Sequence, residues 1–323
     1  MIFTIENLSC GQADCFLIYL ENDLYDKCTI LVDGNREGSK TVAFRTMVNK
    51  NASLESLDYI VVTHVDNDHL GGILSLFKKE PGMTPDISKQ LKDTIIIYNY
   101  VAQGDISYKQ AGILEDLIHG RKVINSFSQK YENNHSMLKF LPLSIRRILE
   151  FTPQRKQNAY FTFLGPNKAG ADSVVMDYNH WYLRGGKQNS ELINKNSITF
   201  LLEFAGKRVL FLGDALLSDV ETALYNIEDP KNPLKIDLIK IPHHGAKENN
   251  FSIGNFSKKH QCTHFILTAK TPWNKDHPAD NVIGQLYQNN PRGTKIYTEL
   301  DLTCIDMKYK YISENNAKTI HLI

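Results

Sequence analysis

The sequence predicts an α/β fold whose strands carry polar residues at their carboxyl ends. Three strand-like runs, residues 59–63, 208–212 and 236–241, are each followed within two residues by His or Asp side chains. Short runs rich in β-branched residues are typical of buried strands. Open α/β sheets place their chemistry beyond the carboxyl ends of such strands, so we expect the three clusters to form one site.

Length and composition set the class of protein. With 323 residues, 42% of them hydrophobic, the chain can bury a sizeable core. We predict a single domain over residues 1–323, with an irregular insertion at about 101–195. The net charge of +1 gives no overall attraction to nucleic acid, so any such binding needs a local patch.

Cysteine use and hydropathy suggest a compartment. The five cysteines are an odd number and none has Cys-x-x-Cys spacing, which favours reduced, core-packed thiols in a cytoplasm. Residues 1–6 resemble a strand rather than a secretory leader. No apolar run reaches the roughly 18 residues that a membrane span needs, so we expect a cytoplasmic protein without a membrane partner.

The elements can be placed in order from the pattern of apolar residues. The first half starts with strands and continues as β–α–β units, which is half of an αβ/βα sandwich. A Gly206-Lys207 turn predicts a hairpin in the second half, and the Asn-, Gly- and Lys-rich residues 167–195 are expected to be a mobile insertion. The predicted strands are 2–6, 15–20, 29–32, 57–63, 93–98, 161–164, 198–204, 208–212, 236–241, 264–268, 295–311 and 318–322, and the predicted helices are 38–50, 73–79, 106–117, 215–225 and 279–289.

A cluster of four candidate metal ligands follows the strand at 57–63. His64, Asp66, Asp68 and His69 precede a Gly71-Gly72 pair that we expect to form a turn. In an extended loop residues 64, 66 and 68 point the same way, so His64 and Asp66 could hold one metal while Asp68 and His69 reach a second. The alternative is a polar surface turn, which Asp and Asn also favour.

Two further clusters end strands in the second half. Asp214 follows the strand at 208–212, where it could also cap the helix at 215–225. His243 and His244 follow the strand at 236–241 and precede Gly245. Adjacent histidines at a strand end beside a glycine are not typical of core histidines.

These motifs resemble those of the metallo-β-lactamase fold, whose usual pattern is His-x-His-x-Asp-His, with Asp66 here in place of the second His. The Asp-containing form followed by Leu-Gly-Gly resembles the hydrolase domain of ComEC competence proteins and their stand-alone relatives. Two further turns are similar: Cys10–Asp14 to Gly-Gln-Gly-Asp, with Ala13 for the second Gly, and Pro242–Ala246 to Pro-His-His-Gly-Ser, with Ala246 for Ser. The resemblance covers about residues 1–75 and 160–311.

The resemblance implies a four-layer αβ/βα sandwich with two divalent metal ions. The implied metal ligands are His64, Asp66, Asp68, His69, Asp214 and His244, and the implied catalytic residues are Asp68, His243 and His277. Asp214 would bridge the metals, and Asp68 would also orient the nucleophile. His243 would be a second ligand or a proton carrier, and His277 could protonate the leaving oxygen. A carboxylate in place of an imidazole tilts the preference from Zn²⁺ toward Mn²⁺.

Some positions keep two interpretations. Asp14 and Asp33 either brace the metal ligands or are turn residues. The fold usually supplies one more His before the bridging Asp, and the candidates are His119, His135 and His180.

The function that fits best is a metal-dependent hydrolase of phosphodiesters, above all a DNA or RNA nuclease with nucleic acid as its partner. The first alternative is a small-molecule hydrolase acting on a cyclic nucleotide, lactone or phosphocholine ester. The second is a non-catalytic binding module, which the full set of ligand types disfavours. The fold serves all these hydrolases, so it cannot decide among them.

A basic segment, Lys139–Lys156, generates a prediction about the substrate. Its strongest pairs are Arg146-Arg147 and Arg155-Lys156, and the alternative to substrate contact is a solvated helix face. Replacing all four by Ala should weaken nucleic-acid binding equally across sequences and flatten its salt dependence. Hydrolysis of a small phosphodiester should be nearly unchanged. Unaltered affinity and salt slope would favour the small-molecule alternative.

Overall fold

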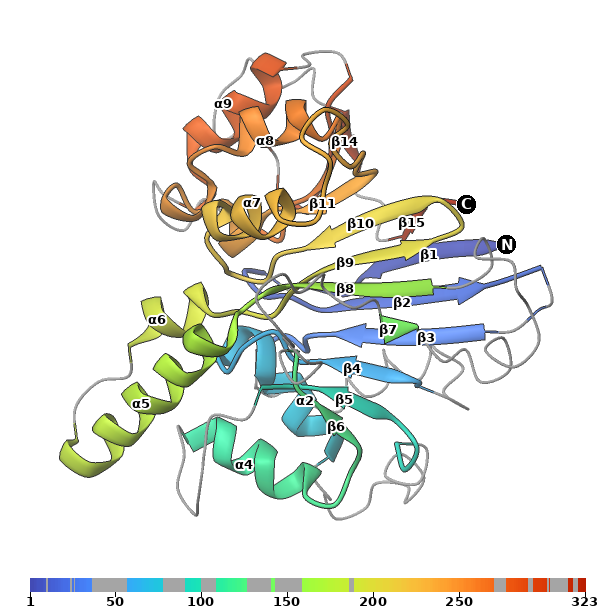
Figure 1. Cartoon of the computed structure of the whole chain (residues 1–323). Helices are drawn as coiled ribbons and strands as arrows, with labels where there is room; N and C mark the ends of the chain where they lie inside the picture. Colours follow the sequence, from blue (N-terminus) through green and yellow to red (C-terminus); the bar gives the residue numbers. More distant parts are fainter. Residues whose placement is uncertain are drawn as a thin grey trace.

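The computed structural model of the chain shows two β-sheets stacked face to face, with helices on the outer faces (Figure 1). The structure describes residues 1–9, 11–23, 25, 27–36, 57–77, 91–99, 109–126, 141–142, 159–185, 189–269, 277–289, 293–300, 302, 313–315 and 319–323.

The first sheet has seven strands in the order β15-β1-β2-β3-β4-β5-β6. Strands β15 to β3 pair antiparallel, and β3 to β6 run parallel. Pairing of β15 with β1 brings the two ends of the chain into one sheet (Figure 1). The bounds are β1 Ile2–Asn7, β2 Phe16–Glu21, β3 Lys27–Val32, β4 Tyr59–Val61, β5 Ile95–Ile97, β6 Val123–Ile124 and β15 Thr319–His321.

The second sheet has eight strands in the order β14-β13-β12-β11-β10-β9-β8-β7. Strands β7 to β10 pair antiparallel, and β10 to β14 run parallel. The expected hairpin is β9–β10. The bounds are β7 Leu141–Pro142, β8 Ala159–Gly165, β9 Thr199–Phe204, β10 Lys207–Phe211, β11 Leu238–Lys240, β12 His264–Ile266, β13 Lys295–Tyr297 and β14 Ser313–Asn315.

Three apolar cores separate four layers. The central core lies between the sheets and is rich in aromatic rings: Phe3 packs on Phe204 with ring centroids 6.0 Å apart, and Phe16 packs on Phe211 at 5.7 Å. Such pairs add to the stability gained from burial alone. A second core joins the first sheet to its helices, and a third joins the second sheet to its own. This arrangement confirms the predicted αβ/βα sandwich.

The helices divide between the two outer faces. Those packed with the first sheet are α2 Asn67–Phe77, α4 Lys109–Ile118, α5 Lys168–Arg184 and α6 Ser190–Lys195. Those on the second sheet are α7 Leu217–Tyr225, α8 Ile253–Lys259 and α9 Asp280–Asn289, and the short 3₁₀ turns are η3 Pro242–Gly245 and η4 Glu248–Asn250. Figure 1 shows α5 and α6 beside the ends of the strands.

Two features differ from the sequence-based expectations. Helix α2 begins at Asn67, so Asp68 and His69 lie in its first turn rather than in a loop, and the expected Gly71-Gly72 turn is helical. The segment 167–195, expected to be a mobile insertion, is largely helical, because α5 and α6 occupy most of it. Val174 and Tyr178, four residues apart, bury one side of α5 in the core of the first sheet. The helix expected at 38–50 lies outside the described residues.

Three cysteines illustrate the layering. Cys15 lies in the core of the first sheet and its helices, Cys28 in the central core and Cys262 in the core of the second sheet. All three are free thiols and buried, as core packing requires. Among the described residues, no helix combines the length and apolar character needed to cross a membrane.

Gly34 generates a prediction about the position of α2. A Cβ atom at Gly34 would lie 2.6 Å from the Ile73 backbone nitrogen, which is part of α2. Gly34→Ala should therefore lower the free energy of unfolding by about 1–3 kcal/mol through overpacking, measured by denaturant titration. Gly206→Ala is the control: its Cβ would meet nothing within 4 Å, so only the strain of its positive φ should appear. Equal losses in the two variants would contradict the close-packing argument.

Candidate metal centre

The site lies where the carboxyl ends of strands from the two sheets meet. Ile198, just before β9, donates its backbone N–H to the Thr63 carbonyl after β4, at 2.8 Å. Gly213, just after β10, has a φ of +49°, and a Cβ there would lie 2.9 Å from Ser197 Cβ and 3.2 Å from Thr63 Cβ. Only glycine lets these three segments approach so closely, and the next residue is Asp214.

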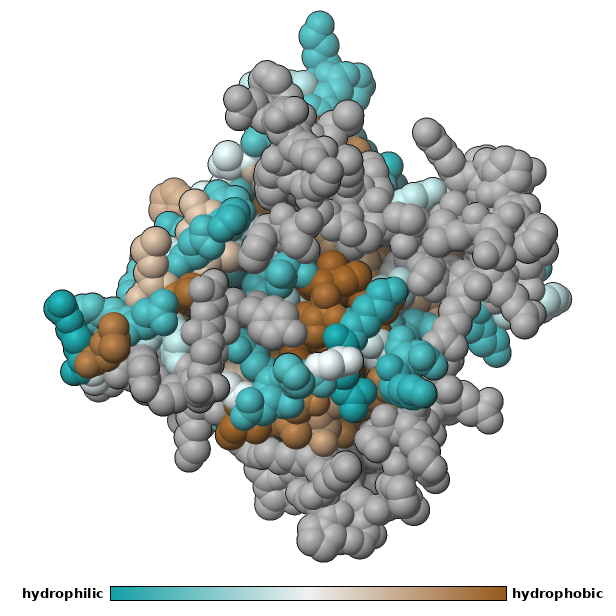
Figure 2. All heavy atoms as spheres, turned by 60° about the horizontal axis from the view of Figure 1, so that its bottom comes forward, coloured by the Kyte–Doolittle hydropathy of each residue, from teal (hydrophilic) through white to brown (hydrophobic). Residues whose placement is uncertain are grey.

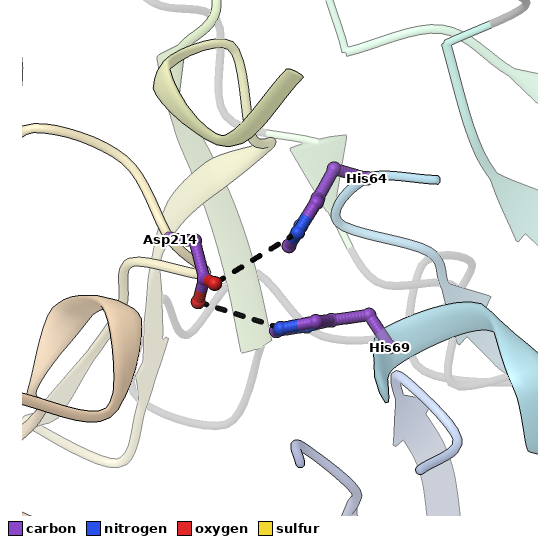
Figure 3. A group of neighbouring side chains, drawn as sticks. All are labelled: His64, His69 and Asp214. Carbon is purple, nitrogen blue, oxygen red and sulfur yellow. Dashed lines mark ion pairs between the residues drawn. The ribbon is translucent and has the colours of Figure 1, made fainter. Parts of the chain in front are cut away.

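The first group of potential ligands is His64, His69 and Asp214 (Figure 3). His69 Nε2 lies 3.4 Å from Asp214 Oδ1, and His64 Nε2 lies 3.9 Å from Asp214 Oδ2. The two imidazole rings are 4.1 Å apart between centroids. All three side chains are buried, so water reaches them poorly.

A second group contains Asp68, His69 and His244. His244 Nε2 lies 3.5 Å from Asp68 Oδ2, which joins the first turn of α2 to the turn η3. Because His69 belongs to both groups, the two adjoin. The ligand atoms of each group lie within 4.8 Å of one another, a spacing that a single cation could span.

Each buried imidazole is held through its Nδ1 atom. His69 Nδ1 lies 2.7 Å from Asp33 Oδ2, and His244 Nδ1 lies 2.9 Å from the Thr268 carbonyl oxygen. His64 Nδ1 lies 3.0 Å from Thr63 Oγ1. A neutral imidazole that donates from Nδ1 keeps its lone pair on Nε2. In the described part of the chain, Nε2 of all three rings is buried without a hydrogen-bond partner, as is Asp214 Oδ1.

Asp33 and Asp14 lie behind the ligands. Asp33 accepts hydrogen bonds from the Thr63 backbone N–H at 2.8 Å and from Thr63 Oγ1 at 2.7 Å, besides its contact with His69. Asp14 accepts a hydrogen bond from Thr268 Oγ1 at 2.7 Å. Its carboxylate also lies 3.7 Å from His69 Nδ1. These contacts place both aspartates where they can orient the imidazoles.

Buried charges shift the acidity of the ligands. Burial alone would lower the pKa of His69, but the Asp214, Asp33 and Asp14 carboxylates outweigh it and raise that pKa well above its usual value. Burial alone would raise the pKa of Asp214, but His69 holds it well below its usual range. Burial and repulsion from His69 lower the pKa of His64 to about 3. When no metal is bound, His69 is therefore protonated beside an ionised Asp214, and a cation would have to displace the proton from its Nε2 atom.

Asp66 lies apart from these groups. It belongs to none of the candidate metal clusters found among the described residues, although it was expected to share a metal with His64. Burial and then repulsion from Asp68 raise the pKa of Asp66 to about 6. The amide nitrogen of Asn194, in the orientation that its neighbours favour, donates to Asp66 Oδ2 at 3.0 Å.

His243 and His277 lie at the more exposed side of the site. His243 Nε2 is 3.7 Å from Asp214 Oδ2, and its Nδ1 is 2.9 Å from Asn249 Oδ1. The His277 ring packs edge-on against His243 at 4.9 Å. His243 and His244 have φ values of +46° and +51°, a left-handed conformation that costs on the order of 1 kcal/mol or more per residue. This strain turns two successive rings toward the site.

Other sequence-based candidates lie elsewhere. His119 is exposed at the end of α4 and His180 is exposed on α5, and neither belongs to a candidate metal cluster of the described residues. His135 lies outside the described residues, as do the basic residues Arg146, Arg147, Arg155 and Lys156.

Sequence reasoning missed several residues that shape the site. Ser197 Oγ lies 3.1 Å from His64 Nδ1 and accepts the Asp214 backbone N–H at 3.2 Å. Lys240 is buried beside Asp14 and Asp214. Arg36 Nη2, on a largely exposed side chain, lies 3.3 Å from Asp68 Oδ2. The only sequence signal for Ser197 was its place before a strand, and the strand at 236–241 gave no sign that Lys240 is buried.

Comparison with known proteins agrees on the fold. Residues 8–84 match the family model of the Metallo-beta-lactamase superfamily, and the two-sheet architecture is the metallo-β-lactamase fold. No curated protein sequence matches the chain.

Solved structures with the same fold are distant in sequence. The metallo-beta-lactamase fold protein YhfI from Bacillus subtilis is 12% identical, with 92% of this chain and 96% of that chain covered and a TM-score of 0.46. Human tRNase Z, short form, is 14% identical, with 82% and 91% covered and a TM-score of 0.41. A diphosphatase from the PhnP family is 12% identical, with 93% and 94% covered and a TM-score of 0.42. At these scores none indicates a substrate.

Proposed function

We propose that the protein is a metal-dependent hydrolase of phosphodiesters. The observation that supports this most directly is the set of buried, unpartnered atoms: Nε2 of His64, His69 and His244 and Oδ1 of Asp214. An orphaned buried acceptor costs about 1–3 kcal/mol, and several that converge are best satisfied by a cation. Nitrogen and carboxylate oxygen together suit Zn²⁺ or Mn²⁺. The donor set therefore fits a metal centre.

The two adjoining groups suggest two ions. His64, His69 and Asp214 would hold the first, and Asp68 and His244 would take part in holding the second. His69 has one Nε2 lone pair and can bind only one of the two ions. The expectation that Asp214 serves both ions and that Asp66 shares the first with His64 remains part of this proposal. Divalent ions at such a site polarise a phosphoryl oxygen and lower the pKa of a water molecule.

The chain's own residues would then divide the work of hydrolysis. Asp68 is ionised, because the nearby imidazoles of His244 and His69 hold its pKa below its usual value despite burial, so it can accept a hydrogen bond from the attacking water. The water oxygen forms the new bond to phosphorus as the bond to the leaving oxygen breaks, and the proton that the water loses passes through the Asp68 carboxylate to solvent. His243 keeps a proton on Nδ1 toward Asn249, and its protonated Nε2 would give a proton to the leaving oxygen. His277 would support the ring of His243.

Nucleic acid is the substrate class that we propose within this reaction. Arg36 is an exposed cation beside Asp68, where it could pair with a substrate phosphate. The similarity of the motifs to ComEC hydrolase domains and the basic segment 139–156 support the same substrate. A small phosphodiester would use the same site, so the comparison of DNA, RNA and a bis-aryl phosphodiester with Mn²⁺ distinguishes the two.

Metal binding is the first test. Protein stripped with a chelator and titrated with Mn²⁺ or Zn²⁺ should bind stoichiometric metal, measured by elemental analysis and calorimetry. His244→Gln should weaken or remove one ion, because it loses the Nε2 lone pair. His119→Gln is the matched control on an exposed histidine and should bind like the native protein. Absence of stoichiometric metal in the native protein would overturn the proposed function.

Catalysis is the second test. Asp68→Ala removes a metal ligand and the residue that orients the water, so the rate should fall about a hundredfold or more. Asp237→Asn is the control, since Asp237 accepts the Arg208 backbone N–H at the opposite end of β10 and β11. Circular dichroism should show that both variants fold. Full activity of Asp68→Ala would remove Asp68 from the mechanism.

A further inference from the structure

A lysine lies fully buried beside the proposed metal ligands. Lys240 is the last residue of β11, an interior strand of the second sheet, and is 1% exposed. Its Nζ donates to the Gly213 carbonyl at 3.0 Å, forms an ion pair with Asp14 and lies 3.6 Å from Asp214 Oδ1. A buried ammonium without such partners would cost several kcal/mol. Its position is therefore set by the two aspartates.

This ammonium cannot itself be a ligand. A charged lysine has three donors and no lone pair, so it cannot bind a metal. It does contact both kinds of acidic residue in the site: Asp214, a proposed ligand, and Asp14, which lies behind the imidazoles. Because like charges repel strongly at low dielectric, a metal bound to Asp214 feels the positive charge of Lys240.

The charges of the site can be compared with the proposed ions. Five aspartates gather within it or along its edge: Asp14, Asp33, Asp66, Asp68 and Asp214. If two divalent ions bind, as the proposed function requires, they balance four of these charges, and Lys240 and the exposed Arg36 beside Asp68 add further positive charge. Without metal, Lys240 is the one buried lysine among the described residues that opposes this acidic cluster.

We propose that Lys240 is a resident cation that keeps the site assembled without metal and thereby limits how tightly metal binds. It holds Asp14 and Asp214 in place while the ions are absent. Once ions bind, the same charge repels them. Lys240 is thus a positioning residue, and this role rests on the metal-binding function proposed above.

Lys240→Met tests the proposal with metal affinity and stability as readouts. The substitution keeps an unbranched side chain, shorter by the terminal atom only, and removes the charge. The melting temperature of the metal-free protein should fall by much more than that of the metal-loaded protein. The metal dissociation constant should decrease by at least about tenfold, because a repulsive charge beside Asp214 is gone. Lys240→Arg, which keeps the charge, should retain the native stability difference between the metal-free and metal-loaded states.

A matched control and a rescue variant separate this role from packing. Lys259, the last residue of α8, pairs with the buried Glu228. Lys259→Met should therefore reduce stability equally with and without metal and leave the metal affinity unchanged. Lys240→Met combined with Asp14→Asn removes one charge of each sign. It should recover much of the metal-free stability even where Lys240→Met alone folds poorly.

The outcomes discriminate clearly. Equal destabilisation of the metal-free and metal-loaded Lys240→Met protein, with metal affinity unchanged or weaker, would overturn the role of Lys240. A lack of recovery in the double variant would do the same. Failure of the native protein to bind metal would instead overturn the proposed function, and it is seen before any variant is made.

Discussion

The candidate site depends on hydrogen bonds made by the Nδ1 atoms of its three buried imidazoles. His64, His69 and His244 each use Nδ1 to contact a side chain or a carbonyl behind the ring. That contact fixes the tautomer and turns Nε2 inward. The acceptors lie on segments from both sheets, so the lone pairs converge only when the sheets are stacked as they are. The large aromatic core between the sheets is therefore a condition for the site as well as for the fold.

The same convergence brings several carboxylates together in a buried site, where nearby hydrogen-bond and ion-pair partners stabilise them. Asp33 and Asp14 are almost fully buried, and each has two or more hydrogen-bond or ion-pair partners. Burial without partners would favour their neutral forms. The Lys240 ammonium pairs with Asp14, and the His69 imidazole contacts Asp33. These contacts keep negative charge close to Asp214. A strained left-handed backbone at His243 is tolerated in the same region, where the surrounding hydrogen bonds fix it.

Much of the fold and the principal clusters of the site could be predicted from local sequence pattern. His64, Asp68 and His69 lie within six residues of sequence, strand-end positions marked Asp214 and the pair His243-His244, and the family resemblance selected His244 as the ligand. Lys240 could not be found in this way, because alternation in a strand does not reveal that a lysine points into a sheet interface. Ser197 meets His64 across 133 residues of sequence, a contact that only the packed sheets create. In residues 167–195 the scattered Asn, Gly and Lys residues hid the apolar spacing that makes α5 helical.

The placement of three cysteines in three separate cores has a practical consequence for following how the layers open. Burial raises the pKa of the Cys28 thiol well above its usual value and that of Cys262 to about 12, so both resist alkylation while their layers stay closed. Cys15 is fully buried in the remaining core. A thiol reagent followed by mass spectrometry would therefore report opening of each layer at its own residue. Such labelling would show whether the two sheets separate at the central core before either sheet separates from its own helices.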